Sequence, residues 1–120
     1  MGYVGMNRPA GRPKQFYKYE LPSGVVKVVR AQCADYKRKE IAIKQGGIEE
    51  EIMQVYITTN EAIKRALGEI EEPCRDSFLS DIAENRGYDK SQSQRMLSHN
   101  AYYARKRKAI YDIAKFLLLI

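Results

Sequence analysis

Apolar positions along the chain recur at helical rather than strand spacing. From Ser23 to Gln45 they fall roughly three or four residues apart, which predicts a first helix over that segment. Gly46 and Gly47 follow it, and glycine commonly stands just past a helix C-terminus. The apolar stripe of this predicted helix consists of Val25, Val29, Cys33, Tyr36 and Ile43.

The start of this segment has a second interpretation. The run from Val25 to Val29 is rich in β-branched residues, so residues 16–21 and 25–29 could pair as a β-hairpin that turns through Pro22. The helix is favoured, but the sequence leaves both structures open for residues 16–29.

A second helical segment begins near Glu49, where three consecutive acids would complement the positive end of a helix macrodipole. Thr58 and Glu61 match a capping box, so the segment is either one continuous helix or two helices that meet there. Its apolar stripe consists of Ile52, Tyr56, Thr59, Ile63, Ala66, Leu67 and Ile70.

Proline and glycine delimit a third helix. Pro73 suits a helix start, the helix is predicted from Cys74 to Asn85, and Gly87 is expected to stop it. Its inward-facing residues are Phe78, Leu79 and Ile82.

A turn over residues 86–90 then leads to a short helix predicted from Ser91 to Leu97. Ser98 has the side chain of a helix N-cap, and the last helix is predicted from His99 to about Leu118. One face of this helix carries Tyr102, Ala109, Ile110, Ile113, Ala114 and Leu117.

These elements predict an all-α fold: one small helical domain over residues 16–120 that ends in a helix-turn-helix over residues 73–118. A length of 120 residues is typical of one domain. Residues 1–15, rich in glycine and proline, are expected to form a flexible basic arm that lies along DNA or is an inert terminus. The chain has no apolar stretch of about 20 residues, so we expect no membrane association and a cytoplasmic location.

Charge is segregated along the chain. The net charge of +6 is distributed as +7 over residues 1–45, −7 over residues 46–84 and +6 over residues 85–120. Residues 105–108 are four consecutive cations, which indicates binding to a polyanion, although a solvated helix face is the alternative.

Other chemistry is sparse. Two cysteines, Cys33 and Cys74, and one histidine provide neither a disulfide framework nor a metal site of known spacing, so both thiols are expected to be buried as small apolar groups. No nucleophile–base pair, phosphate loop or dinucleotide fingerprint is visible, and we therefore expect no catalytic activity, cofactor or metal.

In a helix-turn-helix the last helix enters the major groove of double-stranded DNA by its first turns. Asparagine suits an adenine edge there, arginine or lysine suits a guanine edge, and other cations contact phosphates. The predicted DNA-binding residues are His99, Asn100, Tyr103, Arg105, Lys106, Arg107 and Lys108 on the last helix and Arg86, Lys90 and Arg95 before it.

The stretch from Pro73 to Leu117, and above all residues 98–110, resembles the terminal helix-turn-helix of phage late-gene transcriptional activators of the RinA and ArpU type. That region in turn resembles region four of sigma factors, with Lys108-Ala109-Ile110 in the place of their Lys-Ala-Leu-like run. Arg105 departs from the pattern, because an apolar core residue is usual there. The resemblance implies a sequence-specific transcriptional regulator of phage or bacterial type that contacts RNA polymerase.

Two other functions compete with this one. A protein-binding module or inhibitor could act through the acidic middle segment or the apolar C-terminus, and a DNA-packaging subunit could use a similar helix-turn-helix. The apolar run Phe116–Ile120 either closes the domain's own core, which is favoured, or forms a homodimer surface.

Overall fold

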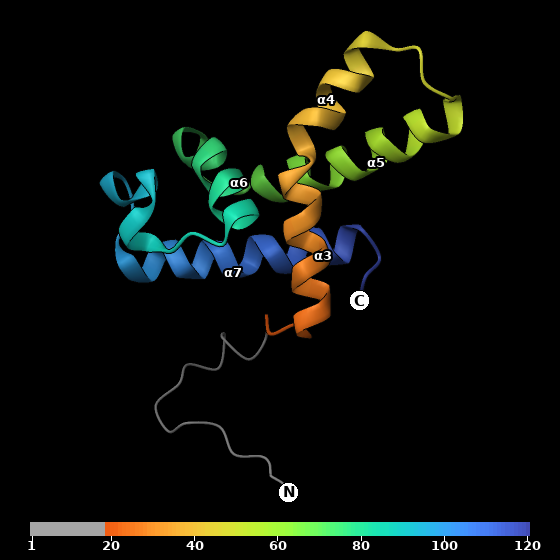
Figure 1. The fold of residues 1–120 in the computed structure, drawn as a ribbon. Helices are drawn as coiled ribbons and strands as arrows, with labels where there is room; N and C mark the ends of the chain where they lie inside the picture. Colours follow the sequence, from red (N-terminus) through yellow and green to blue (C-terminus); the bar gives the residue numbers. More distant parts are fainter. Residues whose placement is uncertain (1–18) are drawn as a thin grey trace, which may run out of the picture.

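The computed structural model of the chain describes residues 19–120, and these residues form helices and no strands, which confirms the all-α prediction for them (Figure 1). The predicted arm over residues 1–15 lies outside the described residues. The α-helices are α3 (Ser23–Ala34), α4 (Tyr36–Gln45), α5 (Glu50–Leu67), α6 (Arg75–Glu84) and α7 (His99–Phe116). Three short 3-10 helices accompany them, η1 (Glu72–Cys74), η2 (Tyr88–Lys90) and η3 (Gln92–Arg95).

The first predicted segment is helical, and the β-hairpin interpretation is wrong. The carbonyl oxygen of Pro22 accepts the N–H groups of Val25 and Val26 at 3.0 and 3.2 Å, and α3 buries Val29 and Cys33 on one face. Burial of this stripe outweighs the β-propensity of the valines. The expected single helix is divided, however, because ψ is 0° at Asp35 and α4 starts at the next residue.

The second segment is one continuous helix, α5, so the alternative of two helices does not hold. The side chain of Thr58 is exposed, and the helix passes through the expected capping box without a break. All six buried residues of α5 lie between Thr59 and Leu67. The apolar stripe predicted for α5 is therefore fully buried only in its second half, since Ile52 is exposed and Tyr56 is half-buried.

The end of α6 differs from the prediction. Asn85, with φ 54° and ψ 43°, takes the left-handed conformation that follows the helix, whereas Gly87 has an ordinary φ of −92°. Asparagine tolerates this conformation better than most residues, so it ends the helix two positions earlier than the glycine would.

The short helix expected over residues 91–97 is only the 3-10 helix η3. Ser91 and Ser93 are both 2 % exposed, and their hydroxyls bond locally: Ser91 Oγ accepts the N–H of Ser93 at 3.0 Å, and Ser93 Oγ bonds to Ser77 Oγ at 2.9 Å. Such side-chain bonds compete with regular helix hydrogen bonds. The predicted helix-turn-helix therefore retains α6 and α7 but lacks an α-helix directly before Ser98.

The core lies where α3 crosses α6 and α7 and where the second half of α5 packs on α7 (Figure 1). Both cysteines are free and buried, as expected, and burial raises the pKa of Cys33 to about 12. Of the predicted α7 stripe, Ile110 and Leu117 are half-buried and the rest are buried. The core residues are Val29, Cys33, Ile63, Ala66, Leu67, Ile70, Cys74, Phe78, Leu79, Ile82, Leu97, Tyr102, Ala109, Ile113 and Ala114.

The C-terminus and the segment around α4 relate to this core in different ways. In the apolar C-terminus, Phe116, Leu117 and Leu119 pack against the core, while Leu118 and Ile120 are exposed, so the run mainly closes the domain itself. At the other side, α4 and the first half of α5 extend away from α6 and α7 as a helical hairpin (Figure 1).

Candidate nucleic-acid interface

The first turn of α7 is capped as the sequence predicted. Ser98 has an extended backbone, with φ −71° and ψ 165°, and its hydroxyl accepts the N–H of Ala101 at 3.2 Å. His99 and Asn100 follow and are exposed. A helix N-terminus carries partial positive charge, which favours an anion such as a phosphate near these residues.

An aromatic cluster supports this turn. The ring of His99 lies 4.9 Å from that of Tyr103 and 5.4 Å from that of Tyr88. The hydroxyl of Tyr103 accepts the backbone N–H of Tyr88 at 3.1 Å, and the hydroxyl of Tyr88 donates to the carbonyl of Leu97 at 2.8 Å. Tyr103, predicted to contact DNA, thus also holds the turn before α7, and sequence reasoning missed the part of Tyr88.

A buried polar group fixes α7 against the end of α6. The carboxylate of Asp81 is fully buried and accepts hydrogen bonds from Arg86 Nη1 at 3.0 Å and from the Tyr102 hydroxyl at 2.8 Å. Burial, and then the bond to Asp81, raise the pKa of Tyr102. Arg86 also bonds to Glu84 and to Ser80, so this predicted DNA-binding side chain is engaged by its own chain.

The cations of residues 105–108 do not share one environment. Arg105 forms a bidentate pair with Glu71, with both N···O distances at 2.7 Å, and the bonds from Arg105 lower the pKa of Glu71. The side chains of this pair are 37 % and 38 % exposed, so solvent screens it. Its small contribution to stability is present above the ordinary pKa of a glutamate and is lost as the pH falls through the lowered value.

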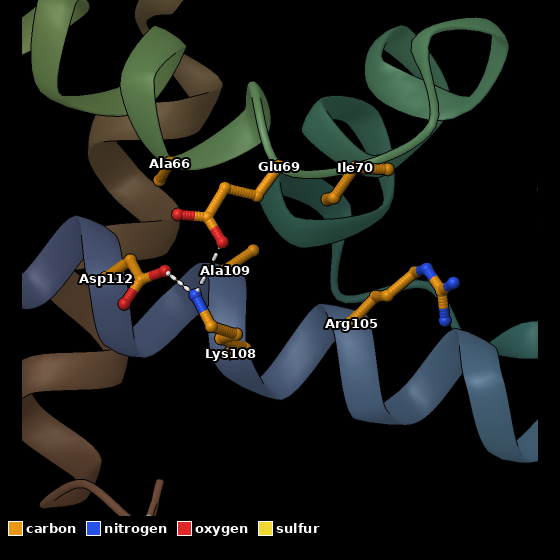
Figure 2. A pocket seen from close by; sticks show the side chains of 7 residues that line it. All are labelled: Ala66, Glu69, Ile70, Arg105, Lys108, Ala109 and Asp112. Carbon is orange, nitrogen blue, oxygen red and sulfur yellow. Dashed lines mark hydrogen bonds and ion pairs between the residues drawn. The ribbon is translucent and has the colours of Figure 1, made fainter.

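Lys108 lies between two acids on the same side of α7. Its ammonium group is 2.7 Å from Asp112 and 2.9 Å from Glu69, and Figure 2 shows it joined to both carboxylates. The bonds to Asp112 and then to Glu69 raise the pKa of Lys108. Glu69 and Glu71, from the acidic middle of the chain, therefore neutralise two cations of the predicted DNA-binding helix.

Lys106 and Arg107 lie on another side of α7, near α3. Together with Arg30 of α3 they line a hollow of about 210 Å³, whose described lining contains no carboxylate. Lys106 donates to the carbonyl of Arg86 at 2.6 Å. Burial lowers the pKa of Lys106 and the charge of Arg30 adds to this, while Asp81 opposes it. The remaining lining residues are Asn85, Tyr103 and Ile110.

Sequence reasoning could not have found Arg30 at this hollow, because only the crossing of α3 and α7 brings it there.

Lys90 and Arg95 end the 3-10 helices η2 and η3, and both are exposed. Of the ten predicted DNA-binding residues, the exposed ones are His99, Asn100, Lys90 and Arg95. Among residues 19–120, no cluster of metal-ligating side chains large enough for a metal site is present.

No helix in the described part of the chain has the length and apolar character to cross a bilayer. Comparison of the sequence and the structure with protein-family models, curated proteins and solved structures finds no match. The geometry of the chain itself is therefore the basis for a function.

Proposed function

We propose that this chain binds double-stranded DNA through the exposed first turns of α7 and the cationic hollow beside them, and that it acts as a sequence-specific transcriptional regulator. The observation that carries the proposal is the meeting of two cations, Arg30 and Lys106, in one hollow next to the exposed first turns of α7. Like charges gathered in this way repel one another, and phosphate oxygens would relieve the repulsion.

Two features support an orientation on DNA. The capped N-terminus of α7 presents Asn100, whose amide suits an adenine edge, next to a ring of His99 held by two tyrosines. Lys90 and Arg95 are exposed in the turns just before α7 and would contact phosphates, which fix the protein on the duplex without reading its sequence. The proposal includes a contact with RNA polymerase, which rests on the resemblance of residues 98–110 to phage late-gene transcriptional activators.

Salt dependence of binding tests the electrostatic part. Each phosphate contact contributes about 0.9 to the slope of log K against log salt concentration. We expect Arg30→Gln, a change in the hollow, to reduce that slope by about one contact. Lys115→Gln is the matched control, because Lys115 is an exposed cation on the last turn of the same helix. Equal loss from both variants would contradict the placement of the contact in the hollow. A wild-type protein without salt-dependent binding would contradict DNA binding itself and favour the protein-binding alternative.

Selection of bound sequences from a random duplex pool tests the specific part. An enriched motif is expected for the wild type, and Asn100→Ala should lose preference at one adenine by about 1–3 kcal/mol. If no sequence is enriched from the pool, the chain binds DNA without sequence preference, which would favour the DNA-packaging alternative.

A further inference from the structure

The helical hairpin formed by α4 and residues 49–58 has an apolar surface that nothing in the described chain covers. On α5, Ile52 is 42 % exposed and Val55 is 60 % exposed. They precede the buried Thr59 by seven and four residues and so lie on the same side of the helix. The stripe that enters the core in the second half of α5 is thus open to solvent in the first half.

The apolar side chains between the two helices of the hairpin are at most half-buried. No apolar side chain of α4 or of residues 49–58 is buried, and the one buried residue of α4 is Lys39. Ile41 on α4 is 56 % exposed. Short helices without a buried apolar face are marginal in water, since helices in proteins are stabilised mostly by packing of such a face. A partner surface would supply that packing.

The charges that flank the exposed apolar residues are opposite in sign on the two helices. On α4, Ile41 has Lys37, Arg38 and Lys44 as its neighbours three or four residues away. On α5, Ile52 and Val55 have Glu49 and Glu51 at the same spacing. The net charge is +3 over α4 and −3 over residues 49–58. Each helix therefore presents an apolar centre with a charged border, and the two borders have opposite sign.

We propose that this surface binds a second copy of the chain, with α4 of one copy lying along the exposed α5 stripe of the other. Ile41 of one copy then packs on Ile52 and Val55 of the other, and lysines meet glutamates at the border. Because every copy carries both helices, α4 of one copy can meet α5 of another, as association of identical chains requires. DNA does not fit this surface, because the acids around Val55 repel phosphates, and a partner of one charge would match only one of the two helices.

A charge-reversal experiment tests the contact without nucleic acid, so its outcome is separate from that of the DNA-binding proposal. One variant reverses the acidic border, Glu49→Lys with Glu51→Lys, and the other reverses the basic border, Lys37→Glu with Lys44→Glu. In an assembly of either variant alone, charges of the same sign meet between α4 of one copy and α5 of the other. In a mixture of the two variants, charges of opposite sign meet there again. Mass is measured by light scattering on the full chain at about 50 µM.

The wild type is expected to associate. Each variant alone should be monomeric, with its dissociation constant raised at least about tenfold, and the equimolar mixture should associate again. Val55→Glu should also abolish association, while Met96→Glu, at a residue 57 % exposed but outside the hairpin, should not. Circular dichroism confirms that the variants keep their helices. A monomeric wild type, or a mixture that stays monomeric, overturns the proposal and leaves the stripe to a different protein.

Discussion

Arg105 and Lys108 lie on the side of α7 that faces Glu69 and Glu71, whereas Lys106 and Arg107 lie near α3. The sequence shows these four cations as one run, and their helical spacing separates them only roughly. The pairing of Arg105 with Glu71 and of Lys108 with Glu69 could not be predicted, because each of these acids lies more than thirty residues from its cation and periodicity reports only neighbours on the same helix. Which cation is available to a phosphate is therefore decided by tertiary contacts.

The two acids beside α7 compete with phosphates for Arg105 and Lys108. Replacing Glu69 and Glu71 together by glutamine should strengthen binding to non-specific duplex DNA several-fold, because both cations lose an internal partner. Fluorescence anisotropy at fixed salt measures the change. Stability should fall by no more than about 1 kcal/mol, since both pairs are partly exposed.

The control for this experiment is a pair of acids away from α7, Glu50→Gln with Glu61→Gln, which removes the same charge. An equal gain in affinity from the control would show that net charge alone matters and that the contacts to Arg105 and Lys108 do not restrain DNA binding.

The buried carboxylate of Asp81 predicts a larger effect on stability. Asp81→Ala removes the carboxylate that accepts the buried Tyr102 hydroxyl and one of the two carboxylates bound by Arg86, which keeps Glu84. The loss should destabilise the fold by about 2 kcal/mol. Tyr102→Phe, which removes one hydroxyl and keeps the ring in the core, should cost about 1 kcal/mol. Urea unfolding measures both, and equal small losses would show that Asp81 is not the centre of this polar group.

Among the elements, helix ends that depend on neighbouring residues were predictable and those that depend on packing were not. The Ser98 cap and the glycines after α4 are local signals, and both predictions are confirmed. The break at Asp35 and the 3-10 helix η3 were missed. The second arises because Ser91 and Ser93 turn inward to Ser77 of α6, a contact that no local pattern reports.

The end of α6 gives a prediction at this scale. Because Asn85 has a positive φ of 54°, Asn85→Ala should destabilise the protein by about 1 kcal/mol, while Asn85→Gly should be close to neutral. Thermal unfolding of the two variants beside the wild type measures the difference. If alanine were tolerated as well as glycine, the left-handed conformation would not be what stops the helix.

In the whole molecule, the described chain measures 54 × 37 × 20 Å along its principal axes, and the α4–α5 hairpin extends away from the core (Figure 1). The sequence predicted the residues of the second half of α5 that enter the core but not the exposure of Ile52 in the first half, since periodicity gives the direction of a face and not its partner. The two halves of the continuous helix α5 are therefore stabilised differently, because the second half is buried in the core and the first half is not.

This difference predicts how the molecule opens. Backbone amides of α4 and residues 50–58 should exchange with solvent at a free energy well below that of global unfolding, because opening the hairpin exposes no buried apolar side chain of those segments. Amides of α7 around Ile113 and of α5 around Ile63 should exchange only through global unfolding, since both residues are fully buried. Native-state hydrogen exchange measures both sets in one experiment.

Repeating the exchange experiment at higher protein concentration should slow exchange in the hairpin alone if a second copy covers its apolar stripe, because binding stabilises only the closed form. Uniform protection along α5 at low concentration would mean that the hairpin is stabilised by its own contacts and needs no partner.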